Sequence, residues 1–202
     1  MSWYRSLYTL KAILFLLEAG VKTNIHYVLM KDSIKEAIEL LEGDKFPKGI
    51  NAVVFLLHKP VGLGSDTQII RKENPDLKRF LECIERKQFP FKIGFDSCTV
   101  PALLGSSSFA SRSMDTCEGG RWSAYISSDL KMMPCSFDNQ KQQWSVDLRS
   151  STIQEAWFSK AFDDFRSHLK NACPECKHRI NCMGGCPICP EIVLCDAHER
   201  KV

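Results

Sequence analysis

The chain has 202 residues, of which 44% are hydrophobic and 25% are charged, and these proportions indicate a globular protein rather than a disordered one. The net charge is only +3 and the basic residues are scattered, so binding to nucleic acid is not expected. The most apolar N-terminal run, residues 12–17, is bounded by charged residues and is too short to span a bilayer, which predicts a cytoplasmic protein without a membrane partner.

The first part of the chain alternates between helical and strand patterns. Residues 3–19 carry leucines at helical spacing and end before Gly20, which predicts an amphipathic helix. Residues 23–29 are rich in β-forming side chains and predict a strand. Ser33 and Glu36 then form a capping-box pattern that predicts the start of a second helix.

The same alternation continues to the middle of the chain. Residues 52–57 are apolar without alternation, which favours a strand buried on both faces of a parallel sheet. Asn74 and Pro75 have the character of an N-cap and a first helical position, and residues 92–95 predict another short strand. The loop at residues 58–64 is interpreted as a structural turn, with ligand contact as the alternative.

Alternating units of this kind predict an α/β fold with a parallel sheet. Three strands are too few to close a barrel, and a parallel sheet needs both faces covered and its edges paired. Residues 1–97 are therefore expected to be part of an incomplete parallel β/α barrel or open sheet. The sequence is therefore interpreted as a truncated piece whose earlier strands lie elsewhere.

A change in composition marks the expected domain boundary. Residues 99–120 are rich in serine and glycine and predict an irregular connection, which places a second domain at residues 98–202. Within it, residues 151–170 have aromatic and aliphatic side chains at helical spacing, and Ser151 is the expected cap of a single helix. Beyond residue 195 only a polar tail remains.

A β-hairpin is expected near the start of this second domain. Residues 122–126 and 131–133 predict two short strands joined by a polar turn. Cys117 and Cys135 flank the pair, so the hairpin could bring two thiols together.

The cysteines carry the strongest chemical signal in the sequence. Eight of the ten lie between residues 117 and 195, and residues 173–186 have the spacing C-x2-C-x5-C-x3-C. Thiolates are soft ligands that suit zinc, copper(I) or iron-sulfur clusters, and a reducing cytosol favours metal ligation over a disulfide-stapled domain. Two four-thiolate centres fit eight cysteines, and the residues alone leave zinc and iron-sulfur equally open.

The order of these cysteines resembles the SPASM domain, the C-terminal extension of many radical S-adenosylmethionine enzymes. The resemblance is carried by Cys117, by Cys135 after seventeen intervening residues, by the run at residues 173–186 and by a last cysteine. The Trp157-to-Leu169 helix and the sequence from Cys117 to Ile126 support it. It implies a half barrel of the radical S-adenosylmethionine type over residues 1–97, followed by a small cysteine-rich α+β domain with a hairpin.

The resemblance also implies two auxiliary [4Fe-4S] clusters with separate ligands. The first would be held by Cys117, Cys135, Cys186 and, as candidate fourth ligand, Cys98. The second would be held by Cys173, Cys176, Cys182 and Cys195, with Cys189 as a competitor of Cys195. Cys83 is expected to be an ordinary core residue.

Three departures from the family pattern limit what can be carried over. Leu130 stands where the family has a glycine, so Ser128 and Asp129 are expected to make the hairpin turn, and Ser136 stands where the sulfatase-maturing members have an acidic base. No C-x3-C-x2-C motif is present, and Cys83 is the first cysteine. The chain alone is therefore expected to be unable to cleave S-adenosylmethionine, which would bind only with the missing N-terminal half.

Two functions remain open from the sequence. The first is the iron-sulfur-binding C-terminal portion of a radical S-adenosylmethionine oxidoreductase or modifying enzyme, with a peptide or protein substrate and a chain that supplies the missing barrel half. The second is a stand-alone thiolate metal module, with zinc or iron-sulfur, for electron transfer or protein binding. No catalytic residue is assigned.

Overall fold

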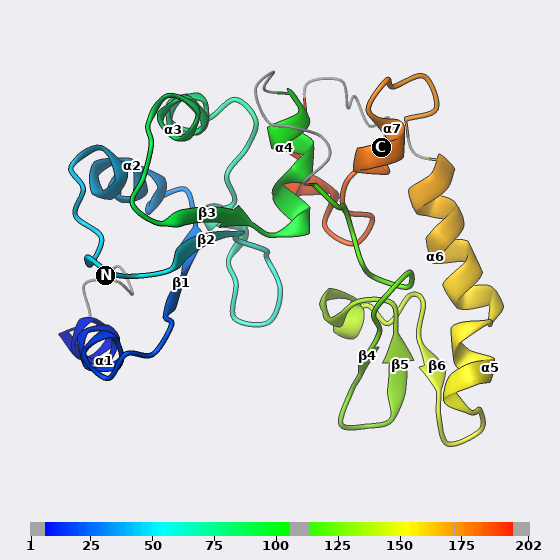
Figure 1. Ribbon diagram of the computed structural model, residues 1–202. Helices are drawn as coiled ribbons and strands as arrows, with labels where there is room; N and C mark the ends of the chain where they lie inside the picture. Colours follow the sequence, from blue (N-terminus) through cyan, green and yellow to red (C-terminus); the bar gives the residue numbers. More distant parts are fainter. Residues whose placement is uncertain (1–6, 106–113, 172, 196–202) are drawn as a thin grey trace.

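The computed structural model describes residues 7–105, 114–171 and 173–195. Within these ranges the chain forms one parallel and one antiparallel three-stranded sheet (Figure 1). The first residues of the predicted N-terminal helix, residues 106–113 of the serine-rich connection and the polar tail lie outside the described residues.

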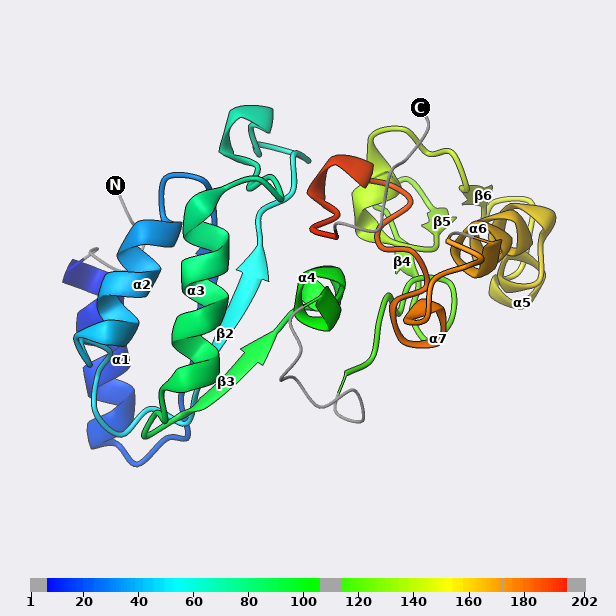
Figure 2. The same cartoon turned by 90° about the horizontal axis from the view of Figure 1, so that it is seen from above.

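The N-terminal part is a parallel sheet with helices on one side, as the alternation predicts. The strands run in the order β1-β2-β3, and Figure 2 shows α1, α2 and α3 on the same side of them. The elements are α1 (Leu7–Glu18), β1 (Asn24–Leu29), α2 (Ile34–Glu42), β2 (Ala52–Leu57), α3 (Pro75–Arg86) and β3 (Lys92–Phe95).

The central strand β2 buries one face completely and the other only in part. It pairs in parallel with both neighbours. Phe55 points to the helices and meets Phe80 of α3 with the ring centroids 4.9 Å apart, whereas Val54 and Leu56 on the opposite face are only half-buried. The prediction of a strand buried on both faces is therefore wrong for the second face, because no helix of the described residues covers it in Figure 2.

Of the two helix caps predicted in the N-terminal part of the chain, Asn74 is correct and Ser33 is not. The Asn74 side chain accepts a hydrogen bond from the Asp76 N–H at 2.9 Å, at the start of α3. Ser33 makes no side-chain cap, because its backbone is already in the helical region at φ −102° and ψ −13°. Its hydroxyl instead donates to the Val28 carbonyl at 2.9 Å, and Glu36 accepts from the Tyr27 hydroxyl at 3.0 Å.

Short helical turns connect the two parts of the chain. A 3₁₀ turn, η2 (Asp66–Gln68), lies in the loop after β2. After β3 the chain enters η3 (Ser97–Thr99) and α4 (Val100–Gly105). In Figures 1 and 2, α4 stands between the parallel sheet and the C-terminal turns.

The predicted hairpin is present, and a third strand extends it. Strands β4 (Tyr125–Ile126) and β5 (Lys131–Met133) pair antiparallel, and β6 (Val146–Asp147) pairs with the other edge of β5. A strand of two residues is too short to leave a pattern in the sequence, which is why β6 was not predicted. The 3₁₀ turn η5 (Ser136–Asn139) follows Cys135.

The hairpin turn corrects one expectation. Ser128 and Asp129 do not replace the left-handed position, because Leu130 itself has a φ of 61°. This conformation is the one that glycine adopts without steric cost. The Ser127 hydroxyl accepts a hydrogen bond from the Lys131 N–H at 3.1 Å and helps to hold the turn.

The predicted helix at residues 151–170 is two helices. They are α5 (Ile153–Trp157) and α6 (Lys160–Asn171). Thr152, rather than Ser151, caps α5 through a reciprocal capping box with Glu155. The chain then turns at Ser159, whose hydroxyl accepts from the Phe162 N–H at 3.4 Å as α6 begins. Two short turns, α7 (Arg179–Cys182) and η6 (Pro190–Ile192), complete the described chain.

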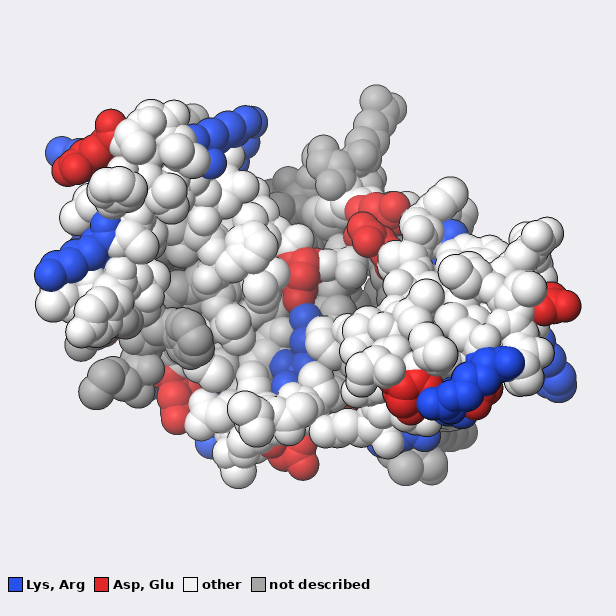
Figure 3. All heavy atoms as spheres, turned by 90° about the horizontal axis from the view of Figure 1, so that it is seen from below, with Lys and Arg blue, Asp and Glu red and all other residues white. Residues whose placement is uncertain are grey.

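One buried apolar cluster extends through both parts of the molecule. It includes Ile13 of α1, Phe55 of β2, Phe165 of α6 and Leu194 near the C-terminus. Trp144 and Phe165 lie edge to face with their centroids 5.1 Å apart. Within the described ranges, no helix has the length and apolar character needed to cross a membrane. Figure 3 shows the charged side chains of one face scattered, with neither sign forming a continuous patch.

Candidate metal centre

Five cysteines from segments distant in the sequence form the first thiol group, which consists of Cys98, Cys117, Cys135, Cys186 and Cys189. The Cys98 thiol is hydrogen-bonded to Cys186, and Cys186 in turn to Cys189. The Cys189 N–H also donates to the Cys186 sulfur at 3.3 Å. Cys117 and Cys135 are close enough to Cys98 for its charge to act on both of them.

Glycine allows the two hairpin cysteines of this group to approach each other. A Cβ atom on Gly119 would lie 3.4 Å from the Cys117 sulfur and 2.9 Å from the Pro134 carbonyl oxygen. The Gly120 N–H donates to the same Pro134 carbonyl at 3.1 Å. The segment after Cys117 therefore lies directly against the segment that ends in Cys135, and a larger residue at position 119 would separate them.

Burial and hydrogen bonds favour the protonated form of Cys98, Cys117, Cys135 and Cys186, whereas the hydrogen bond to Cys186 lowers the pKa of Cys189. Burial raises the pKa of Cys117 to about 11. Its hydrogen bond to Cys189 raises the pKa of Cys186 to about 12, and the hydrogen bond to Cys186 together with burial raises the pKa of Cys98 far above its ordinary value. Because the thiolate is the metal ligand, a bound metal has to displace these protons.

The second thiol group consists of Cys173, Cys176, Cys182 and Cys195 in the C-terminal turns. Cys182 is buried, which raises its pKa, and the charges of Cys195 and Cys173 act on it in the same direction. Cys176 lies one turn after Cys173, because its N–H donates to the Cys173 carbonyl at 3.1 Å. Figure 1 places these turns beside α4 and the end of α6.

Left-handed backbone bends the chain between the two groups. Met183, Gly184 and Gly185 follow Cys182 with φ values of 52°, 80° and 79°. The N–H groups of both glycines donate toward the Cys182 sulfur, and a Cβ on Gly185 would lie 2.7 Å from the Val193 side chain. Gly184 and Gly185 therefore form the bend that follows Cys182.

A buried hydrogen bond fastens the two groups to each other. The Thr116 hydroxyl, next to Cys117, donates to the Cys182 carbonyl at 2.8 Å. Thr116 is 3% exposed, so water cannot replace this bond. The segment that carries Cys117 is thereby held against the C-terminal cysteines at residues 173–186.

Of the two remaining cysteines, only Cys189 departs from the sequence expectation. Cys189 lies with the first group rather than beside Cys195. Cys83 lies on α3, where burial raises its pKa and the neighbouring charges are those of Glu42, Lys87 and Arg79 rather than other cysteines. All ten cysteines are free thiols.

The donors of both groups are cysteine thiols. Thiolates are soft ligands that suit zinc or iron-sulfur clusters. Among the described side chains, no group of three or more His, Cys, Asp or Glu residues converges on the position of one metal ion.

Two charged residues beside the first thiol group were not predicted as part of a site. Lys59 follows β2 and Asp96 follows β3, and their side chains form an ion pair. The sequence offered one signal, since ligand-facing residues in parallel sheets lie at the carboxyl ends of strands. The predicted turn at residues 58–64 is confirmed, because His58 Nε2 lies 3.0 Å from the Ser65 carbonyl and the loop closes on itself.

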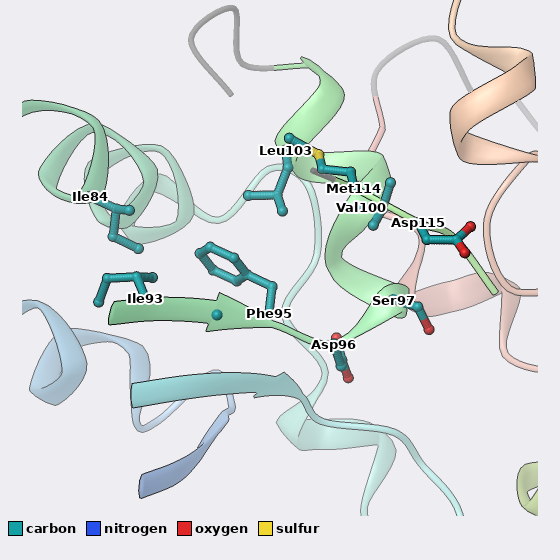
Figure 4. Close-up of a pocket in the computed structure, with 10 residues that line it drawn as sticks. Ile84, Ile93, Phe95, Asp96, Ser97, Val100, Leu103, Met114 and Asp115 are labelled. Atoms are coloured by element: carbon teal, nitrogen blue, oxygen red, sulfur yellow. The ribbon is translucent and has the colours of Figure 1, made fainter. Parts of the chain in front are cut away.

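A pocket of about 340 Å³ opens beside β3. Figure 4 shows Ile84, Ile93, Phe95 and Leu103 around it, with Asp96 and Asp115 toward one end. The Asp96 carboxylate accepts from the Thr99 N–H and hydroxyl at 3.2 and 2.7 Å, as expected of a capping aspartate. Most of the residues that line the pocket are apolar.

Comparison with known proteins identifies the cysteine-rich part. Residues 117–189 match the family model of the SPASM domain, described as an iron-sulfur cluster-binding domain. This match includes the hairpin, α5, α6 and most of both thiol groups. A comparison with curated protein sequences finds no match.

The fold as a whole is similar to that of SuiB from Streptococcus suis. The SuiB structure with S-adenosylmethionine bound aligns with a TM-score of 0.64 and 18% identity, over 95% of this chain and 48% of SuiB. The structure with the precursor peptide SuiA bound aligns with a TM-score of 0.62 and 18% identity, over 95% and 48% of the two chains. The chain thus spans about half the length of SuiB. The predicted resemblance of the cysteine-rich part to the SPASM domain is confirmed.

Proposed function

We propose that the chain binds two auxiliary [4Fe-4S] clusters and is the C-terminal portion of a radical S-adenosylmethionine oxidoreductase that modifies a peptide or protein. The observation that carries this proposal is the division of the thiols into two groups inside a region that matches an iron-sulfur-binding domain. The half-length similarity to SuiB supports the wider assignment.

We assign the ligands of the two clusters by thiol group. Cys98, Cys117, Cys135 and Cys186 hold the first cluster, and Cys189 competes with Cys98 because it lies against Cys186. Cys173, Cys176, Cys182 and Cys195 hold the second cluster. We also propose that the domain boundary lies after residue 97, which would put all of these ligands in the C-terminal domain.

The residues of the chain prepare each site in three ways. The Gly119 and Gly185 contacts bring the thiols together, the Gly184 and Gly185 N–H groups donate to the Cys182 sulfur, and burial excludes water from Cys182, Cys186 and Cys189. When bound, an iron-sulfur cluster supplies one-electron transfer or an anchor for substrate. The polypeptide supplies ligands, hydrogen bonds and a dry environment.

We further propose that these 202 residues do not cleave S-adenosylmethionine by themselves, because they contain no C-x3-C-x2-C motif. Catalysis then requires a segment that carries this motif and completes the barrel. The half-exposed second face of the parallel sheet is a surface that such a segment could cover. A peptide substrate is proposed because SuiB has a structure with the precursor peptide SuiA.

The proposed location is a reducing cytoplasm. All ten cysteines are free thiols, and their clustering next to one another would favour disulfides in an oxidising compartment.

Metal analysis of the anaerobically purified protein tests the proposal. We expect brown protein that contains iron and acid-labile sulfide and absorbs broadly at about 400 nm. Colourless protein that carries zinc instead would support a zinc-binding thiolate module and contradict the proposal. If the protein binds iron-sulfur clusters but associates with no segment that completes the barrel, the result would contradict the enzyme assignment and support a role in electron transfer.

A further inference from the structure

Lys59 is a buried cation at the boundary between the parallel sheet and the first thiol group. Its side chain is 10% exposed and that of its ion-pair partner Asp96 is 15% exposed. The two residues follow β2 and β3, so they lie side by side at the carboxyl ends of adjacent parallel strands. A lysine is rarely buried to this degree unless another charge compensates it.

The carboxylate of Asp96 is shared among several donors besides Lys59. It accepts from the Leu57 N–H at 3.1 Å and from the Thr99 N–H and hydroxyl at 3.2 and 2.7 Å. These donors already stabilise the carboxylate charge, so Asp96 remains satisfied without a full positive charge beside it. The Lys59 ammonium also has neighbours other than Asp96.

The first thiol group is among these neighbours of Lys59. The charges of Cys98 and Cys186 act on the Lys59 ammonium, and the Phe137 ring centroid lies 5.2 Å from its nitrogen. Phe137 lies in η5, two residues after Cys135. The ammonium group thus meets three of the four segments that carry the first thiol group.

The loop that presents Lys59 has little freedom to move it away. The Val61 N–H donates to the Lys59 carbonyl at 2.9 Å, and the Gly64 N–H donates to the Val61 carbonyl at the same distance. A Cβ on Gly64 would lie 2.3 Å from the Lys59 carbonyl oxygen, so only glycine fits there. The backbone at Lys59 is therefore fixed, and the ion pair with Asp96 holds the ammonium group.

The environment keeps Lys59 charged. The Lys59 ammonium is buried, and its charge is compensated by the ion pair with the Asp96 carboxylate. Four thiolates around a cluster core of formal charge about +2 leave a net charge of about −2, and each one-electron reduction adds a further negative charge. A fixed positive charge in a dry site stabilises the reduced form more than the oxidised form.

We propose that Lys59 is the fixed counter-charge of the cluster held by the first thiol group, and that it raises the reduction potential of that cluster without ligating it. This inference rests on the proposed function, because it requires a cluster at that group. In the reduction itself an external donor loses one electron and the cluster gains it, and Lys59 keeps its proton and its charge throughout.

The test is a redox titration of the reconstituted protein, with Lys59→Gln as the variant. Glutamine removes the charge but can still donate a hydrogen bond to Asp96. We expect one of the two clusters to shift to a more negative potential while the other is unchanged. Lys59→Arg, which keeps the charge, is expected to restore most of the wild-type potential.

Lys87 provides a matched control elsewhere in the molecule. It pairs with Asp44 at 2.8 Å, its side chain is 27% exposed, and its nitrogen lies 5.7 Å from the centroid of the Phe89 ring. Lys87→Gln removes the same charge from a similar setting and is expected to leave both potentials unchanged. An equal shift in both variants would show an effect of net charge alone and would overturn the inference.

The outcomes separate this inference from the proposed function. A wild-type protein that takes up no iron overturns both. A Lys59→Gln variant that is loaded with iron but titrates like the wild type overturns only the role of Lys59. Should Lys59→Gln not fold, as judged by far-UV circular dichroism, Lys59→Arg decides the matter, since a large negative shift in that charged variant contradicts the inference.

Discussion

At the scale of single residues, left-handed backbone shapes the surroundings of both thiol groups. Cys173 has a φ of 51°, Met183 one of 52° and Leu130 one of 61°. For a residue with a side chain this conformation costs about 1–2 kcal/mol relative to the right-handed region. Cys173 and Met183 lie within the closely spaced cysteines of the C-terminal run, and Leu130 lies in the hairpin turn between β4 and β5.

Replacing Leu130 by glycine is expected to stabilise the protein. The Leu130 side chain is 47% exposed, so its removal loses little apolar burial, and glycine relieves the left-handed strain. Glycine also adds freedom to the unfolded chain, so we expect a net gain of only about 0.5 kcal/mol in the free energy of unfolding. Urea denaturation of the metal-free protein measures it.

Leu63→Gly is the control for this substitution. Leu63 is fully exposed and is not among the residues with positive φ, so the same change there is expected to give no gain in stability. A Leu130→Gly variant that is less stable than Leu63→Gly would contradict the account of the hairpin turn.

At the scale of elements, the sequence predicted the N-terminal part better than the C-terminal part. Strands β2 and β3 have the predicted bounds, and Asn74 caps α3 as predicted. The continuous apolar run of β2 and the cap of α3 are clear local signals. The break between α5 and α6 at Ser159 was not predicted, because the apolar spacing continues across it.

The capping box of α5 is expected to contribute measurably to stability. Thr152→Ala removes a hydroxyl that accepts from the Glu155 N–H at 3.2 Å. We expect a loss of about 1 kcal/mol in the free energy of unfolding. Ser151→Ala, one residue earlier, is the control and should have almost no effect. Equal losses in the two variants would argue against Thr152 as the cap.

At the scale of the whole molecule, the two thiol groups differ in how far the sequence predicts them. Three of the four members of the second group lie within residues 173–182, so spacing alone suggests that they meet. The first group joins Cys98, Cys117 and Cys186 through the tertiary fold, and neither the place of Cys189 nor that of Lys59 follows from spacing. Contacts between distant segments depend on packing that a local pattern does not encode.

The activity of the chain alone provides a test at this scale. We expect the reconstituted and chemically reduced 202-residue protein to form no 5′-deoxyadenosine from S-adenosylmethionine, because it has no C-x3-C-x2-C motif. Liquid chromatography with mass spectrometry measures the product, and a protein-free sample provides the comparison. Product above the level of that sample would contradict the proposal that cleavage of S-adenosylmethionine needs a further segment.

The most direct test of the two-cluster account is the iron content of Cys186→Ala. Wild-type protein is expected to hold about eight iron atoms per chain, and the variant about four, because Cys186 belongs only to the first thiol group. Cys83→Ala, which removes a thiol on α3 outside both groups, should keep the wild-type content. Unchanged iron in Cys186→Ala, or complete loss of iron with the fold intact, would contradict the account.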